Sequence, residues 1–132
     1  MSLVVLYLST AIVFLGLDVI GLRYLIRPVF ERQIGDLLAD PFRLGPAAVF
    51  YLFYVLALLI LVTAPMLETG SYGRIALKAA LFGAVGYGTY EFTNLATLKA
   101  WSWGMVALDL SWGIFLTTAA ALAGVAITRA VT

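Results

Sequence analysis

The 132-residue sequence contains no cysteine and no histidine. Without cysteine, disulfide bonds, thiol catalysis and thiolate metal sites are excluded. Without histidine, the chain lacks the commonest metal ligand and the usual general base near neutral pH. The sequence therefore predicts no metal site and identifies no cofactor. Any chemistry must come from Asp, Glu, Tyr, Lys, Arg, Asn, Thr or Ser, or from a bound group.

Charge is scarce as well, since charged residues make up 11% of the chain and hydrophobic residues 64%. Soluble domains carry about 25% charged residues, so this composition points to a bilayer. Each apolar window approaches the roughly 20 residues that a helix needs to cross the hydrocarbon layer. We expect an all-α fold, with residues 1–132 forming a single transmembrane domain, a four-helix bundle. The predicted spans are about 3–22, 47–66, 76–98 and 105–128.

Net charge is only +1, and no dense basic patch suggests a nucleic-acid partner. The first window has no basic residues before it and carries Asp18, so we predict a retained span rather than a signal peptide. Four arginines between the first two windows predict that this loop is cytoplasmic, together with the loop that holds Lys99. The charge bias is shallow, and dual insertion stays open.

The first loop also predicts a short interfacial helix over about 28–39, because Pro28 suits a first helical turn and apolar residues follow at helical spacing. Asp40-Pro41 would end it. The pairs Ala79/Gly83 and Ala84/Gly88 predict close helix packing in lipid. Four residues at span ends are expected to anchor the protein at the membrane interface: Tyr72, Lys78, Trp101 and Trp103.

Acidic side chains at membrane depth are the most informative feature. An acid at a helix centre costs roughly 2.5–3.5 kcal/mol on insertion scales, so a partner, a proton or a function must offset the cost. Asp18 would reach Arg23, and Asp109 or Glu91 would reach Lys99, through extended side chains. A purely structural role, in which ion pairs and hydrogen bonds lock the helices together, therefore stays open.

Depth and helical spacing predict that these polar residues converge. At about 1.5 Å per residue, they lie roughly 6–10 Å from the same membrane surface. Tyr90, Glu91 and Asn94 share one stripe of the third window. We expect a half-membrane cavity that opens to the cytoplasmic side. Its predicted catalytic residues are Glu91, Asp109 and Asp18, and its predicted ligand-binding residues are Asn94, Tyr90, Tyr51, Tyr54 and Trp112.

At these residues the chain resembles a family of small bacterial integral membrane proteins, domain of unknown function 2177. The chain departs from the family pattern at Glu91, where Asp is more usual, and at Gly21, where Trp is typical. The longer Glu keeps the charge type, whereas Gly21 would remove a wall from the predicted cavity. The resemblance implies a multi-pass protein of the bacterial inner membrane and brings no activity. The matching stretches are QIGDLL at 33–38, YGTYEFTNLATLKAW at 87–101 and DLSWG at 109–113, with Asp18 as the acid of the first helix.

Three functions remain open from the sequence. The cavity would bind a lipid-like or isoprenoid-like molecule, with Glu91 as proton donor and Asp109 or Asp18 as base for acid–base chemistry. Alternatively, the acids would couple protons to the transport of a small solute, which with four spans requires a homo-oligomer. The third alternative is a structural or accessory subunit of a membrane complex. Membrane lipid is an expected partner in every case.

Overall fold

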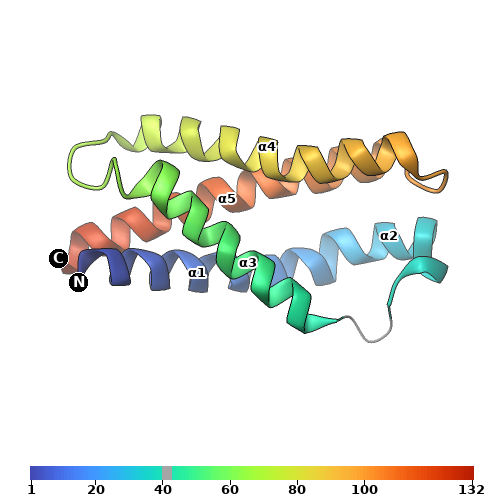
Figure 1. The fold of residues 1–132 in the computed structure, drawn as a ribbon, viewed down its shortest axis with the longest axis horizontal. Helices are drawn as coiled ribbons and strands as arrows, with labels where there is room; N and C mark the ends of the chain where they lie inside the picture. Colours follow the sequence, from blue (N-terminus) through green and yellow to red (C-terminus); the bar gives the residue numbers. More distant parts are fainter. Residues whose placement is uncertain (40–42) are drawn as a thin grey trace.

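The computed structural model describes residues 1–39 and 43–132, and within these residues the chain is entirely helical apart from its turns (Figure 1). The predicted all-α membrane fold is confirmed. The predicted break at Asp40-Pro41 lies outside the described residues. The α-helices are α1 (Ser2–Gly21), α2 (Arg27–Ile34), α3 (Leu44–Leu58), α4 (Tyr72–Thr97) and α5 (Trp103–Val131). Wider π-helical turns extend α1 over Leu22–Ile26 and α3 over Leu59–Thr63, and a 3₁₀ turn, Gly35–Leu37, follows α2.

The first span and the predicted interfacial helix form one continuous helix, rather than two helices separated by a loop. The backbone stays helical from Ser2 to Leu37. Pro28 lacks the N–H that an α-helix would donate to the preceding turn. The wider π-helical turn over Leu22–Ile26 ends two residues before this proline, and Pro28 lies in the first turn of α2, where a missing N–H is tolerated. The helix therefore continues past Asp18 and carries α2 beside the bundle.

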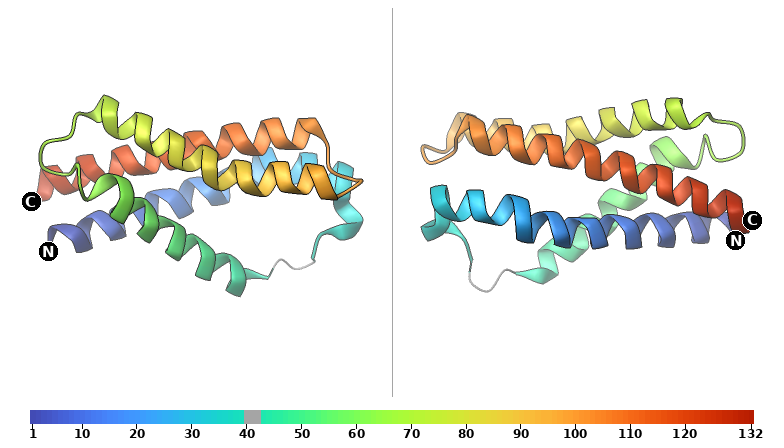
Figure 2. Two further views of the ribbon diagram at one scale, coloured as in Figure 1. Left: turned by 45° about the horizontal axis from the view of Figure 1, so that its top comes forward. Right: turned by 180° about the vertical axis from the view of Figure 1, so that it is seen from behind.

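α5 is the central helix, because it packs along both α4 and α1 (Figure 2). Glycines permit these close contacts. A Cβ atom on Gly83 of α4 would lie 3.1 Å from the carbonyl oxygen of Gly113 on α5. A Cβ atom on Gly124 would lie 2.0 Å from the Thr10 hydroxyl oxygen of α1. Close backbone approach of this kind drives helix association where water exclusion contributes little.

α3 crosses the bundle obliquely, and its N-terminal end diverges from α4 and α5 (Figures 1 and 2). At its other end, α3 and its π-helical extension join an apolar core with α1, α4 and α5. α3 is therefore packed against the other helices at the end that holds both chain termini and diverges from them at its N-terminal end, where α2 and α5 share a separate apolar core. The apolar core at the packed end comprises Leu6, Leu58, Leu59, Val62, Met66, Ile75, Ala79, Ala121 and Val125.

By length and composition, three helices of the described chain would cross a membrane: Ser2–Leu37, Leu44–Thr63 and Trp103–Val131. α4 has 26 residues, so length does not exclude it. Its second half carries Glu91 and Asn94 among threonines and tyrosines, which lowers its mean hydropathy. The four predicted windows each fall on one of the long helices. That α4, which carries the third window, also crosses the membrane stays a prediction.

Candidate ligand-binding cavity

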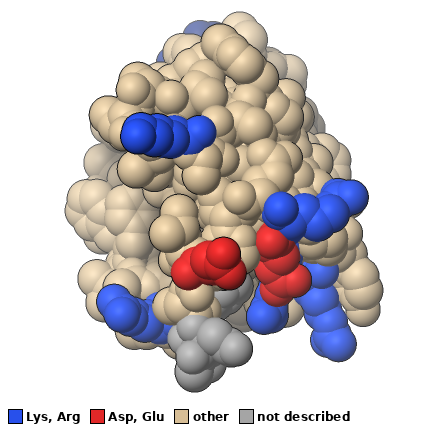
Figure 3. All heavy atoms as spheres, turned by 90° about the vertical axis from the view of Figure 1, so that its right-hand side faces the viewer, with Lys and Arg blue, Asp and Glu red and all other residues tan. Residues whose placement is uncertain are grey.

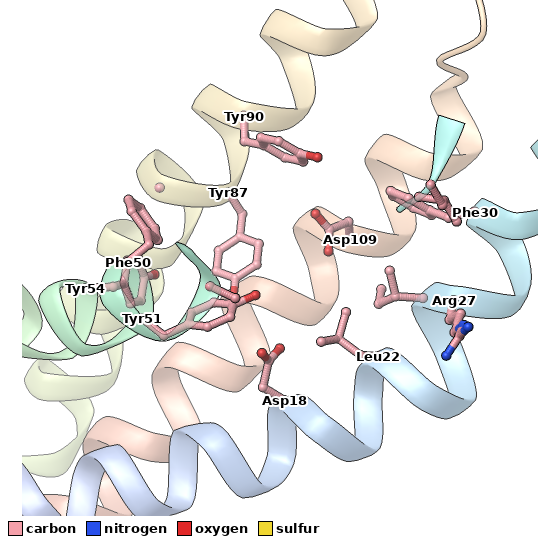
Figure 4. A pocket seen from close by; sticks show the side chains of 14 residues that line it. Asp18, Leu22, Arg27, Phe30, Phe50, Tyr51, Tyr54, Tyr87, Tyr90 and Asp109 are labelled. Carbon is pink, nitrogen blue, oxygen red and sulfur yellow. The ribbon is translucent and has the colours of Figure 1, made fainter. Parts of the chain in front are cut away.

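A cavity of about 480 Å³ lies where α3 splays away from the bundle (Figure 4). Five of the eight residues predicted for the site line it: Asp18, Tyr51, Tyr54, Tyr90 and Asp109. The rest of the lining is mainly apolar and consists of Leu22, Ile26, Arg27, Phe30, Leu38, Ala47, Phe50, Gly86 and Tyr87. The cavity thus combines a long apolar wall with a small number of polar groups, as ligand sites usually do.

Small residues and aromatic rings together shape this cavity. Ala47 and Gly86 face it from α3 and α4 and leave space that larger side chains would fill. Tyr54 closes the inner end, where its hydroxyl forms a 2.8 Å hydrogen bond with Thr117 Oγ1 of α5. The Tyr54 ring lies 6.0 Å from the ring of Tyr87, nearly edge-on. The wall is therefore a packed aromatic surface anchored to α5.

Two buried carboxyl groups are the main polar features of the wall. Asp18 of α1 is 5% exposed and Asp109 of α5 is 9% exposed. They come from opposite sides of the cavity, and both side chains point into it (Figure 4). The Tyr51 hydroxyl, from α3, lies beside the Asp18 carboxyl. Three helices thus bring hydrogen-bonding groups to one place, as the depth argument predicted.

Glu91 lies behind this wall rather than in it. Its side chain is 0% exposed, and its Oε1 accepts a 2.9 Å hydrogen bond from Trp101 Nε1. Oε2 has no donor among the described residues. The Glu91 side chain interacts with the Asp109 carboxyl, which does face the cavity. Glu91 is therefore linked to the cavity through Asp109.

Asn94 and Trp112 are also absent from the cavity lining. Asn94 is half-buried and interacts with the Tyr90 hydroxyl, so it supports a lining residue. Trp112 covers Gly21, where an added Cβ atom would lie 2.2 Å from the indole ring. Gly21 consequently removes no wall from the cavity, because its missing side chain makes room for Trp112.

None of the predicted ion pairs is formed in the described part of the chain, where the salt bridge present joins Arg27 to Glu31 at 2.5 Å. Arg23 instead lies 5.7 Å from the ring centre of Tyr24. The end of the molecule nearest the cavity carries both basic and acidic side chains on its surface (Figure 3).

Trp101, expected at the membrane interface, is instead buried. Its side chain is 9% exposed and packs edge-on against Phe30, with ring centres 5.4 Å apart.

Sequence reasoning missed the part of the lining that α2 and the π-helical turn provide. Leu22, Ile26 and Phe30 follow Asp18 at intervals of four residues, which is a helical stripe. The sequence contains this stripe, but the predicted loop after residue 22 would interrupt it, so Ile26 and Phe30 were not predicted for the site. Tyr87, which lies three residues before Tyr90 and so on the same helical stripe, also lines the cavity and was not predicted for the site. Its buried hydroxyl lacks a partner among the described residues.

In residues 1–39 and 43–132, no group of three or more His, Cys, Asp or Glu side chains could hold a metal ion. No curated protein and no solved structure matches the chain. Residues 3–126 match the family described as "Predicted membrane protein (DUF2177)". This match confirms the resemblance drawn from the sequence motifs, and it covers both carboxyl groups of the cavity wall. The chain therefore belongs to the DUF2177 family of predicted membrane proteins.

Proposed function

We propose that this membrane protein binds a lipid-like or isoprenoid-like molecule in the cavity between α1, α3, α4 and α5. The observation that carries the proposal is the burial of two carboxyl groups, Asp18 and Asp109, in a wall that is otherwise mainly aromatic and aliphatic. The apolar chain of the ligand packs on that wall, and its polar end meets the carboxyl groups. The volume of about 480 Å³ falls within the roughly 300–1,000 Å³ of small-molecule sites.

The position of the cavity supports entry from the side. Phe50 lines the cavity and is 59% exposed, so its ring lies at the rim on the diverging end of α3. In a bilayer this surface faces acyl chains, which would enter without crossing the polar interface. The rim lies near the cluster of arginines in the first loop, and the positive-inside rule places that end in the cytoplasmic half of a bacterial inner membrane.

Acid–base chemistry on the ligand is the catalytic form of this proposal. Asp109 contacts the ligand and exchanges protons with Glu91 behind it. Asp18 acts on the ligand from the opposite wall. Neighbouring carboxyl groups that hold different numbers of protons provide both an acid and a base within one site.

The apolar core at the packed end weighs against transport through a single chain. Leu6, Leu58, Ile75, Leu116 and Val125 are fully buried there or next to the cavity. Among residues 1–39 and 43–132, the buried side chains that carry an acid are Asp18, Glu91 and Asp109, and the other buried polar side chains are threonines. A transport pathway would then need a second copy of the chain. A purely structural role for the acids is the outcome expected if the cavity holds no ligand in the membrane.

A matched pair of variants tests the proposal. Ala47 lines the cavity, whereas its neighbour Ala48 is exposed and does not line it. Gently purified wild type, Ala47→Trp and Ala48→Trp would be compared by native mass spectrometry with lipid analysis. We expect a retained lipid-like species in wild type and Ala48→Trp, and its loss in Ala47→Trp.

Asp109→Asn extends this test from the apolar wall to the polar end of the site. This variant should weaken retention of the same species while preserving the fold, as judged by gel filtration and thermal unfolding. Identical, empty spectra for all four proteins would overturn the proposal and favour the structural role.

A further inference from the structure

The polar wall of the cavity is rich in acceptors that carry or can carry negative charge. Asp18 and Asp109 approach from α1 and α5 and interact electrostatically with each other. Arg27 is the basic residue of the lining, but it lies outside the inner wall, is half-exposed and is paired with Glu31. The inner wall therefore repels an anionic head group and attracts a cation.

Aromatic rings strengthen this preference. Tyr51 and Tyr87 lie along one side of the space between the two carboxyl groups, and Tyr90 lies on the Asp109 side (Figure 4). The face of an aromatic ring attracts a cation by about 0.5–2 kcal/mol, with the larger values at desolvated sites. The Tyr87 hydroxyl is buried and has no hydrogen-bond partner in the described residues.

Glu91 adds an independent observation that points to a missing proton or ligand. It is fully buried, and its Oε2 has no donor within the described chain. The neighbouring carboxyl group is that of Asp109. Two carboxyl groups form a hydrogen bond with each other only when one of them holds a proton. Glu91 and Asp109 can thus share one proton, and a cation that binds Asp109 would displace that proton.

We propose that the cavity selects cationic amphiphiles, molecules with a protonated amine at the end of an apolar chain, and exchanges each for one proton. The ammonium group lies between Asp18 and Asp109, and the chain follows the wall towards Phe50. This inference rests on the proposed function, because it names the ligand class of the same cavity. When the ammonium binds Asp109, the proton shared with Glu91 leaves to solvent. One positive charge enters and one leaves, so the charge of the buried site is unchanged.

Because binding releases a proton, it should strengthen as pH rises, as long as the amine itself stays protonated. The titratable and charged groups that face Asp109 come from every neighbouring element. They are Asp18 on α1, Arg27 on α2, Tyr51 on α3, and Tyr87, Tyr90 and Glu91 on α4.

The test uses three amphiphiles that share one chain length: dodecylamine, dodecanol and dodecanoate. Each would be titrated into the purified full-length protein in lipid nanodiscs, with affinity and proton uptake or release measured by calorimetry in buffers of different ionisation enthalpy. We expect the amine to bind about tenfold more tightly than the alcohol, a difference of about 1.4 kcal/mol. The carboxylate should bind most weakly, and only amine binding should release a proton.

Variants separate the contributions of the carboxyl groups. Asp109→Asn should remove the preference for the amine over the alcohol. Glu91→Gln should keep amine binding but abolish proton release, whereas Glu68→Gln, in the exposed turn before α4, should match wild type. If Asp109→Asn fails to fold, the comparison of three ligands on wild type still decides.

The two proposals fail in different ways. Saturable binding of the alcohol with no preference for the amine would overturn the cationic ligand class and leave the lipid-binding function standing. Amine binding without proton release would overturn the exchange. No saturable binding of any amphiphile would overturn the proposed function itself.

Discussion

Trp101 Nε1 donates a 2.9 Å hydrogen bond to Glu91 Oε1, and both side chains are buried. This bond joins the loop between α4 and α5 to the deepest acid of α4. The same indole packs edge-on against Phe30 of α2 and against Tyr90, with ring centres 5.4 Å and 5.9 Å apart. Trp101 therefore connects Glu91 to two residues that line the cavity.

Replacing Trp101 by Phe should destabilise the protein, because the ring stacking is kept while a buried carboxyl oxygen loses its donor. We expect a fall of about 1–3 kcal/mol in the free energy of unfolding. Thermal or denaturant unfolding in detergent measures it. Trp103→Phe is the matched control, since Trp103 is 71% exposed and should change stability little. Equal losses in both variants would contradict the role given to the Trp101–Glu91 bond.

Gly21 is expected to tolerate no side chain while Trp112 keeps its position. A Cβ atom would lie 2.2 Å from the rigid indole ring, so Gly21→Ala should cost about 1–3 kcal/mol of stability through overpacking. Gly16→Ala, one and a half turns earlier with nothing within 4 Å, should be neutral or slightly stabilising.

A double-mutant cycle tests the cause of that loss. Adding Trp112→Leu to Gly21→Ala should remove part of its cost, because the smaller side chain leaves room for the new methyl group. Additive losses would show that the two residues are energetically independent, against the contact seen here.

The hydrogen bond between Tyr54 and Thr117 should hold α3 against α5. Tyr54→Phe removes the hydroxyl and keeps the ring, so we expect a loss of about 0.5–1.5 kcal/mol. Thr117→Val should cost a similar amount. Because both changes break the same 2.8 Å bond, the double variant should lose less than the sum of the single losses. Strict additivity in thermal unfolding would rule out the bond as a stabilising contact.

Arg129 is predicted to order the turn between α3 and α4. Its guanidinium nitrogens donate to three carbonyl oxygens, those of Leu67 at 2.8 Å, Met66 at 3.1 Å and Gly70 at 2.6 Å. Arg129→Gln should release these carbonyls and cost about 1.5–3 kcal/mol, the range for hydrogen bonds from charged groups. Hydrogen–deuterium exchange of residues 64–71 should rise. The exposed Arg74→Gln serves as control, and exchange that rises equally in both variants would refute the prediction.

The sequence predicted the membrane-depth acids and their common level well enough to assemble most of the cavity. Asp18 and Asp109 do face each other across it, and Tyr51, Tyr54 and Tyr90 line it. These placements follow from regular helical geometry, in which spacing along the chain sets both depth and direction. The assignments of function to these residues stay predictions.

Where the backbone or the packing departs from regular geometry, the sequence was a poorer guide. Pro28 suggested a new helix, whereas the π-helical turn before it lets one helix run on to Leu37. Trp101 was expected at the membrane interface but turns inward to Glu91. Its direction depends on the space between α2, α4 and α5, which no local pattern encodes.

By itself, the sequence determined that this is a helical membrane protein of one family, with acids and tyrosines at one level by helical spacing and with neither thiol nor imidazole side chains. Long apolar runs and residue types carry that information, because insertion and helix formation depend on local composition. Only the tertiary structure decided that Asp109 meets the cavity while Glu91 lies behind it, and that Trp112 fills the space over Gly21. The positions of these side chains depend on how α3 diverges and on which side chains fill the gaps between the helices. Close packing of this kind is set by all the helices together, so no single segment of the sequence determines it.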